Sequence, residues 1–572
     1  MPLFDLASNC CPTYLDNQGT NERPWDLVVA FDEFTPGNVV KTTANKRKSM
    51  ALHYTFLQFG DYTRNQLAWF CPMVLRSTKA KRLKGQWSHA LSAFLELALL
   101  DKHAGMDCVG VALDIRGSTV VVWAKLKFTL TDGDGFAQAF FWKGASSTKP
   151  CIKCWNVLMK SAKVAPPHVA LHDVSGFQQT THQGTIHIIE SLTAAKERVQ
   201  RKEITTKSFE KRETKCGFRA CQFSVLANVR VRTCFSFPHV VYYDWMHIFL
   251  QDGILNVEFA AFFTTCIKFG IEEARLDRLD EFLIMKNWEY PHRVDHFSAS
   301  VVADLCQGKS TVSMRCAAST LLTAFVVLRF YCDTEIPADP RIKMHRTSLR
   351  LACSMVTTIT ECKARLLSKG AAAEQLQKQW GVWTQAHKCA YAQRFLKPKF
   401  HWASHLPPQF EAFLDMFVVE RMNKKAKAAA QACDTGTRYE KSVVQRYMKN
   451  HLGRLDACGP FGASKLQGAI SNDDRHPGCN CARFIMDEFG GKFTIGDVVF
   501  STSGALGKIV QCCERGGDHF VSVQVMRSLG EIAYRSWACI ATDVLVSWPL
   551  GAFFAAASWH VIRADDRWVV LR

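Results

Sequence analysis

The sequence has few of the features that place a chain in a membrane or outside the cell. Its longest uncharged run lies within residues 544–562, where Pro, Gly, Ser and His interrupt it, so turn-linked strands or a buried helix explain it better than a membrane span. The N-terminal segment MPLFDLASNCCPTYLD has no basic stretch followed by an apolar one, and a secretory signal is therefore not expected. We also find no internal repeat and no low-complexity tract.

Acidic residues are scarce relative to basic ones. The chain has 52 Asp and Glu against 71 Lys and Arg, which gives a formal charge of +19 and a pI near 9.1. This excess favours a polyanionic partner, nucleic acid first and an anionic membrane surface second, although a basic surface without a specific partner is the alternative.

Hydrophobic residues make up 48% of the 572 residues, which predicts a folded chain of about two to four domains. Without secretion, the 23 cysteines are expected to be mostly reduced thiols, with metal binding open to those that are closely spaced.

Apolar, β-branched and aromatic residues predict five strands before residue 250. They lie at residues 26–34, 49–59, 68–75, 118–132 and 235–244. Residues 86–102 carry apolar side chains at helical spacing, and helical patterns also follow the fourth and fifth strands.

Acidic residues stand at or near the ends of three of these strands: Asp32 on the first, Asp132 on the fourth and Asp244 on the fifth. Ligand sites of α/β sheets gather at strand ends, so the sheet can bring such carboxylates together. The order of strands and helices, with acids on the first and fourth strands, predicts a ribonuclease H-like α/β fold with a mixed sheet.

The remaining sequence predicts further parts. Residues 1–250 would form the first part of the core, with a Cys-rich insertion at about 145–233, and residues 396–460 would complete it. Residues 251–395 have mostly helical patterning and predict a large all-α insertion. Short strands and Gly-rich turns within residues 485–572 predict a small C-terminal β-barrel.

Phosphodiester chemistry would explain why acids gather at one end of a sheet. It uses two divalent metals about 3.5–4 Å apart, one at the attacking oxygen and one at the leaving oxygen. Mg²⁺, or Mn²⁺ in its place, takes oxygen ligands and keeps several waters, so two or three carboxylates suffice. Asp32 and Asp132 are natural ligands, and the third should come from a helix over the sheet.

Four segments together resemble cut-and-paste DNA transposases with an Asp-Asp-Glu site, of the CACTA-like group. These segments are VVAFDEFTPGN, TDGDGFAQAFFWKGASSTKPCIKC, YYDWMHIFLQDG and KFHWASHLPPQFEAFLDMFVVERMNKKAK, and the resemblance covers about residues 25–435. The family has a second Asp followed by Lys-Gly and Cys-x-x-Cys, then an Asp-x-x-His, a helical insertion and a helix with the Glu. The resemblance implies Mg²⁺-dependent DNA cleavage and strand transfer.

By this resemblance, Asp32 matches the first acid and Asp132 the second. Asp134 is the alternative second acid because it lies in the same turn, but Asp132 ends the strand and fits the family's spacing. Either aspartate would instead cap the following helix if it had no catalytic role.

Glu420 matches the third acid, and Glu411 is its rival. Nine residues at about 100° each would put these two on opposite faces of one continuous helix beginning near Pro408. A solvated surface glutamate is the alternative for Glu420.

Asp244 and His247 match the family's Asp-x-x-His. His247 would lie one helical turn from Asp244, near the carboxylates, and would contact the scissile phosphate or orient a metal ligand. The alternative is a helix-capping Asp and a half-buried His. His401 and His405 would be an i, i+4 pair if helical, but the prolines that follow leave a structural role open.

Cys151, Cys154, His168 and His172 have the spacing C-x2-C-x13-H-x3-H, which fits a structural zinc site. Cys216 and Cys221 are alternative partners for the first two cysteines. The Pro-Cys-x-x-Cys segment is also found in zinc deaminases, but these need an upstream His-x-Glu that the sequence lacks, so we reject a deaminase.

Basic residues cluster in residues 196–219 and in the segment NKKAK, and we expect contacts with the DNA backbone there. A solvated helix surface is the alternative, because glutamates are interspersed. The predicted nucleic-acid-binding residues are Lys196, Arg198, Arg201, Lys202, Lys207, Lys211, Arg212, Lys424 and Lys425.

The sequence is therefore interpreted as a nuclear, DNA-binding, transposase-like enzyme without a membrane segment, and a homo-oligomer is compatible with this interpretation. The family usually has a DNA-binding module before the catalytic domain, and only some 25 residues precede the first strand here. The alternatives are a domesticated, non-catalytic DNA-binding protein of the same fold, and a nuclease without transfer activity.

Overall fold

The structure is a computed structural model, in which the chain divides into two compact units. Unit 1 comprises Met1–Asp244 and Phe400–Phe461, and unit 2 comprises Trp245–Lys399 and Gly462–Arg572. The residues that the structure describes are 19–36, 48–115, 118–159, 166–171, 173–275, 278, 282, 313–314, 316–392, 394–433, 436–457, 464–468, 470–472, 476–487, 491–533, 535–555, 558–562 and 567–571.

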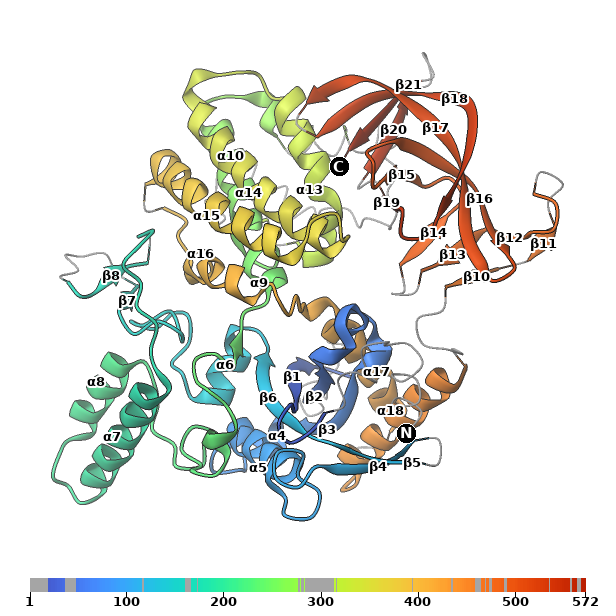
Figure 1. The fold of residues 1–572 in the computed structure, drawn as a ribbon. Helices are drawn as coiled ribbons and strands as arrows, with labels where there is room; N and C mark the ends of the chain where they lie inside the picture. Colours follow the sequence, from blue (N-terminus) through green and yellow to red (C-terminus); the bar gives the residue numbers. More distant parts are fainter. Residues whose placement is uncertain are drawn as a thin grey trace. The chain divides into compact units, whose positions relative to one another are not determined.

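Unit 1 is built on a five-stranded mixed sheet of order β3-β2-β1-β6-β9 (Figure 1). β1 is antiparallel to β2, β2 is antiparallel to β3, and β6 is parallel to both β1 and β9. The strands are β1 (Trp25–Phe34), β2 (Ser49–Phe56), β3 (Phe70–Arg76), β6 (Ala124–Leu130) and β9 (Val241–Tyr242). The predicted α/β class with a mixed sheet is confirmed.

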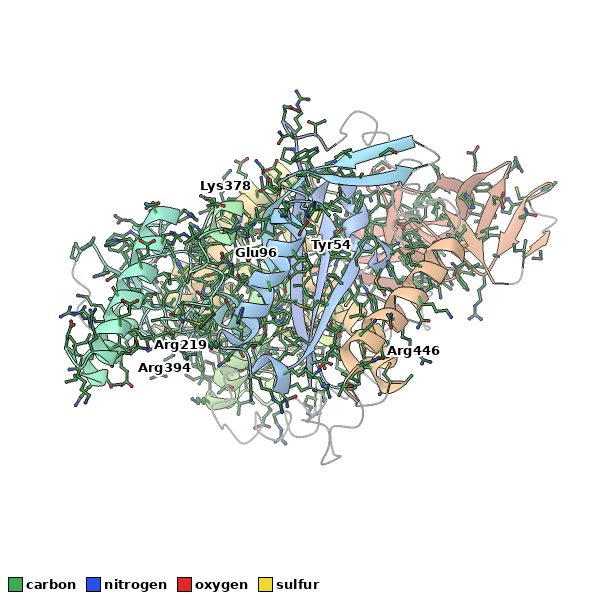
Figure 2. All side chains as sticks on the ribbon, turned by 90° about the horizontal axis from the view of Figure 1, so that it is seen from below. Tyr54, Glu96, Arg219, Lys378, Arg394 and Arg446 are labelled. Carbon is green, nitrogen blue, oxygen red and sulfur yellow. The ribbon has the colours of Figure 1, made fainter. Side chains whose placement is uncertain are left out.

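Helices cover both faces of this sheet, and β1 accordingly has buried side chains on both sides. On one face Phe31 contacts Trp87 of α5 (Gln86–Leu100), with ring centroids 5.5 Å apart. On the other face Phe34 and Val74 pack in one core with α17 (Met416–Gln431) and α18 (Tyr439–Ala457). Figure 2 marks Tyr54 on β2 and Glu96 on α5.

The predicted strand at 118–132 is two strands, because the chain changes partner at Trp123. β5 (Ser118–Val122) forms an antiparallel hairpin with β4 (Val111–Ile115), whereas β6 joins the main sheet. The predicted strand at 235–244 is also shorter, since only β9 pairs. The other elements of unit 1 are α4 (Ser77–Ala80), α6 (Gly133–Phe140), β7 (Val157–Leu158), β8 (Val169–Ala170), α7 (His182–Gln200) and α8 (Thr206–Cys216).

The helix predicted to begin near Pro408 begins instead at Met416. The two prolines lie in a short 3₁₀ turn, Pro407–Gln409. This turn does not continue into α17, because the chain is extended at Asp415. The premise that Glu411 and Glu420 share one helix was therefore wrong.

Helices form the first part of unit 2. They are α9 (Trp245–Phe249), α10 (Ile254–Lys268), α13 (Ala318–Thr334), α14 (Lys343–Lys363) and α15 (Lys369–Tyr391), and α16 (Pro398–Trp402) spans the boundary with unit 1. A buried carboxylate joins three of them: one Glu258 oxygen accepts hydrogen bonds from Ser348 and Trp383, each at 2.8 Å, and lies 2.6 Å from His387 Nδ1.

The C-terminal strands of unit 2 do not form the predicted β-barrel. The main path of the large sheet is β11-β12-β16-β17-β18-β21-β20, and among the described residues its end strands do not pair with each other, so the sheet is open. β10, β13 and β14 form a separate three-stranded sheet. The strands are β10 (Lys465–Gln467), β11 (Ser471–Asn472), β12 (Asn480–Ala482), β13 (Phe484–Met486), β14 (Lys492–Thr494), β15 (Val498–Ser501), β16 (Leu506–Arg515), β17 (Asp518–Ala533), β18 (Ser536–Pro549), β19 (Phe553–Ala555), β20 (Ser558–Ile562) and β21 (Arg567–Leu571).

Within the described ranges, no helix combines the length and the apolar character needed to cross a bilayer.

The fold of unit 1 should be sensitive to acid through His53, which is fully buried on β2. Burial lowers the pKa of His53 from 6.5 to about 4. Because the folded-state pKa is below the unfolded-state value, the stabilisation is present above pH 6.5 and is lost as the pH falls toward 4. We expect His53 to lower the free energy of unfolding by about 2 kcal/mol between about pH 7.5 and pH 5.

Urea unfolding of the full chain at both pH values would measure this effect. His53→Gln should reduce the pH dependence by that amount, and an unchanged dependence in the variant would contradict the assignment.

Candidate functional site

Two cysteines and two histidines converge inside unit 1. Cys151, Cys154, His401 and His405 are all buried, and their ligand atoms lie within 4.8 Å of one another. The His405 Nε2 atom is 3.4 Å from each sulfur and 3.2 Å from His401 Nε2. Residues some 250 positions apart in the chain therefore meet in one cluster, and the residues that the structure describes contain no other group of candidate ligands as close.

The spacing of these atoms fits tetrahedral zinc. Zn–N and Zn–S distances of about 2.0–2.1 Å and 2.3 Å place two nitrogens about 3.3 Å apart and a nitrogen and a sulfur about 3.6 Å apart. The observed distances of 3.2 and 3.4 Å are close to these values. Two thiolates and two imidazoles are also a common donor set of structural zinc. The cluster could therefore hold a metal such as zinc.

Aromatic side chains enclose the cluster. Tyr243 places its hydroxyl 3.4 Å from the Cys151 sulfur and stacks on Trp402, with ring centroids 5.0 Å apart. Trp402 donates a 2.8 Å hydrogen bond to the Pro150 carbonyl, and Phe177 packs edge-on against His401 at 4.4 Å. This shell keeps water from the donors and holds the Cys-x-x-Cys turn in place.

The electrostatics of the cluster also suit a cation. Burial alone would raise the pKa of the Cys151 thiol, but the Cys154 hydrogen bond and the nearby histidines outweigh burial and hold that pKa well below its usual range. Burial lowers the pKa of Lys153 to about 8, opposed by the two cysteines. A thiolate is therefore favoured beside the histidines.

Both cysteines of the predicted zinc site belong to the cluster, but the histidines beside them are not the predicted ones. His168 instead packs edge-on against Trp155, with ring centroids 5.7 Å apart, and His172 lies outside the described residues. The sequence spacing predicted the histidines that follow the cysteines closely. Spacing does not show which residues return to the cysteines after a long insertion. The i, i+4 spacing of His401 and His405 was the available signal.

Hydrogen bonds hold the segment between the Cys-His cluster and α17 against β9 and the two residues that follow it. Gln409 donates to the Val241 carbonyl at 3.0 Å and accepts from the Tyr243 N–H at 3.1 Å. Asp244 accepts a 3.0 Å hydrogen bond from the Met416 N–H, the first residue of α17. Asp244 is 2% exposed, so it serves as a buried cap for the helix that carries Glu420.

The first two predicted acids lie near the ends of neighbouring parallel strands: Asp32 is two residues before the end of β1, and Asp132 is two residues after the end of β6. Ala30 of β1 lies opposite Leu130 of β6, so Asp32 and Asp132 follow at equal distances along the chain. Thr131 donates a 2.8 Å hydrogen bond to the Phe31 carbonyl and ties these two ends together. Asp132 also caps α6, accepting from the Gly135 N–H at 2.6 Å.

Asn423 joins α17 to the first acid. Its amide nitrogen donates to Asp32 Oδ2 at 2.8 Å, and its amide oxygen lies 3.2 Å from His53 Nε2. Glu420 precedes Asn423 by three residues on α17, so both lie on one side of the helix. Asn423 was not predicted from the sequence, although it lies three residues after the predicted Glu420.

The three carboxylates of Asp32, Asp132 and Glu420 do not form a group as tight as the Cys-His cluster among the described residues. All three are half-buried, whereas the rivals Asp134 and Glu411 are exposed. His247 lies on α9 in unit 2, so its proposed role beside the acids stays a prediction.

The predicted DNA-binding cations occupy mostly exposed positions. Lys196, Arg198, Arg201, Lys202, Lys207, Lys211 and Arg212 lie on or between α7 and α8. Arg198 and Arg201 both pair with Glu203, at 3.0 and 2.8 Å. Lys424 is exposed, but the ammonium group of Lys425 is enclosed and lies near His451.

Metal analysis should find about one zinc per chain in the purified protein. His405→Ala and Cys154→Ser should each remove it, because each deletes one of four ligands, whereas the control His168→Ala should keep it. Zinc loss in the control together with retention in His405→Ala would instead favour the ligand set predicted from the sequence.

No protein-family model matches this chain, and no curated protein is significantly similar to it.

Proposed function

We propose that this protein cleaves DNA strands and joins them to a new site, as a divalent-metal-dependent enzyme of the transposase type. The observation that carries the proposal is the placement of Asp32 and Asp132 near the ends of neighbouring parallel strands, with α17 bonded to Asp32. The strand order β3-β2-β1-β6-β9 fits the ribonuclease H-like core that the sequence resemblance implies.

The donor atoms of the acid site suit Mg²⁺ or Mn²⁺. Carboxylate oxygens are hard ligands, and half-buried carboxylates leave room for the waters that Mg²⁺ retains. Asp132 uses one oxygen as a helix cap, and a carboxylate has a second oxygen for a cation. When bound, a pair of ions would activate the attacking oxygen and neutralise the leaving oxygen.

The chain's own residues would arrange this site. Asp32 and Asp132 would hold cations from the sheet, and Glu420 would add a carboxylate from α17. Asn423 would orient Asp32, because its amide fixes one carboxylate oxygen. Asp244 would hold the N-terminus of α17, and with it the turn that carries Glu420.

We further propose a structural role for zinc at Cys151, Cys154, His401 and His405. Four protein ligands fill a tetrahedral site and leave no position for a substrate. The cluster lies ahead of the β9-bound segment that leads to α17, so it would set where that helix begins.

The main alternative is a domesticated DNA-binding protein that keeps the fold without catalysis. Among the described residues the three acids are not grouped as tightly as the Cys-His cluster, which favours this alternative. A two-metal site needs carboxylates on both sides of a pair of ions about 4 Å apart, so this separation does not exclude catalysis.

Asp132→Asn should reduce nicking of supercoiled plasmid DNA in Mg²⁺ or Mn²⁺ by more than about 100-fold, because the change removes the charge that a cation needs. DNA binding should stay nearly unchanged. The matched control is Asp134→Asn, which removes an exposed charge two residues away and should retain nicking. Glu420→Gln and Glu411→Gln form a second pair with the same expectation.

Equal activity of both members of each pair would contradict the acid assignment. A wild-type chain that binds DNA but nicks it in neither metal would support the domesticated alternative.

Asn423→Ala should reduce nicking by about 10–100-fold, because it releases Asp32 from its orienting hydrogen bond. The Mg²⁺ concentration for half-maximal nicking should rise, which a general loss of stability would not cause. Activity titrated with Mg²⁺, at a temperature where the variant is folded, would measure this. An unchanged metal requirement would show that Asn423 does not position Asp32.

A further inference from the structure

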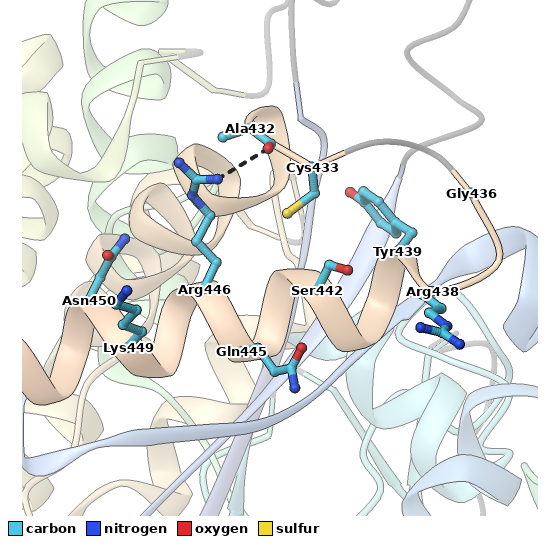
Figure 3. A pocket seen from close by; sticks show the side chains of 10 residues that line it. All are labelled: Ala432, Cys433, Gly436, Arg438, Tyr439, Ser442, Gln445, Arg446, Lys449 and Asn450. Carbon is cyan, nitrogen blue, oxygen red and sulfur yellow. Dashed lines mark hydrogen bonds between the residues drawn. The ribbon is translucent and has the colours of Figure 1, made fainter.

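A hollow of about 700 Å³ opens where α17 ends and α18 begins (Figure 3). Arg438, Arg446 and Lys449 line it, and its described lining residues include no Asp or Glu. Ser442, Gln445 and Asn450 add hydroxyl and amide groups. The surface therefore presents cations together with neutral hydrogen-bond donors, which is the chemistry that binds phosphate oxygens.

The helical repeat explains why these side chains share one face. Residues 442, 445, 446 and 449 recur at spacings of three and four on α18. The opposite face buries Val443 and Tyr447 in the core shared with the sheet. Arg446 extends outward from α18 in Figure 2, and its guanidinium donates a 3.3 Å hydrogen bond to the Ala432 carbonyl, near the end of α17. This bond places the cation across the hollow.

Residues of β3 and α4 hold the wall of the hollow in place. Arg76 donates to the Gly436 carbonyl at 3.3 Å and lies over the Tyr439 ring at 4.8 Å. Glu440, beside Tyr439, pairs with Arg76 at 2.7 Å and with Lys79 at 2.8 Å. The charge of this acid is therefore compensated, and it does not offset the cations that line the hollow.

We propose that this hollow, on the surface of α18, binds phosphates of the DNA backbone. It lies at the far end of the helix that carries Glu420, about 18 Å along α17. This distance corresponds to about five base pairs. The hollow would thus hold the duplex beside the cleaved bond and not at it. The location relative to the cut rests on the proposed function, whereas the binding itself does not.

The test compares two double variants that remove the same charge from the same helix. Arg446→Gln with Lys449→Gln alters the hollow. Lys441→Gln with Arg454→Gln alters exposed positions of α18 outside it. Binding of a fluorescent duplex of random sequence to the full chain is measured across salt concentrations in EDTA, so that cleavage plays no part.

The measured quantity is the slope of the logarithm of the binding constant against the logarithm of the salt concentration. The hollow variant should lower the magnitude of this slope by about 2, since each lost phosphate contact changes it by about 0.9. The control should change it by less than half as much. Equal slopes in the two double variants would overturn the proposal. Inorganic pyrophosphate is the second probe: tight binding that requires Arg446 and Lys449, without an effect of these residues on DNA, would overturn it in favour of a small phosphate ligand.

These measurements separate the two proposals. A wild-type chain that fails to nick DNA while the slopes differ as expected would remove the catalytic proposal and retain the DNA-binding hollow.

Discussion

The carboxamide of Asn423 is the contact on which the arrangement of unit 1 depends. It donates to a carboxylate on β1 and faces the ring nitrogen of a buried histidine on β2, so one side chain of α17 is bonded to two strands. The amide donates to Asp32 through its nitrogen, and its oxygen accepts from His53 when the imidazole proton is on Nε2. The bond therefore fixes the rotation of α17 over the sheet, and this rotation decides that Glu420 faces the same side.

The Cys-His cluster supplies a second constraint, at the point where the chain leaves and re-enters unit 1. Tyr243 and Asp244 end the first segment of this unit, and His401 lies just after the start of the second. Tyr243 contacts Cys151 and stacks on Trp402, so both ends of the excursion meet at the cluster. A metal bound there would hold the two ends of a long chain segment together. Such a cross-link stabilises more when the loop that it closes is longer.

Positive charge is distributed in two different ways in unit 1. On α7 and α8 the cations alternate with glutamates, and two arginines share Glu203. On α18 the hollow gathers cations without an acid in its described lining. Net charge alone would favour the first region, which is longer and more basic in sequence, but in the second the described lining residues bring cations together in a shaped surface without an acid among them. Affinity for a polyanion rises with such local concentration of positive charge.

The sequence by itself determined the local elements of unit 1. The apolar segments of β1, β2 and β3 and the helical repeat of α5 need no distant partner to be recognised, and Asp32 and Asp132 lie within two residues of the ends of β1 and β6. Sequence also marked Cys151 and Cys154, because a Cys-x-x-Cys turn is a local pattern. Tertiary structure decided the rest: it paired these cysteines with His401 and His405, used Asp244 to cap a helix 172 residues away, and left the C-terminal sheet open. Each of these depends on contacts between distant residues, and residue spacing carries no information about which distant segments meet.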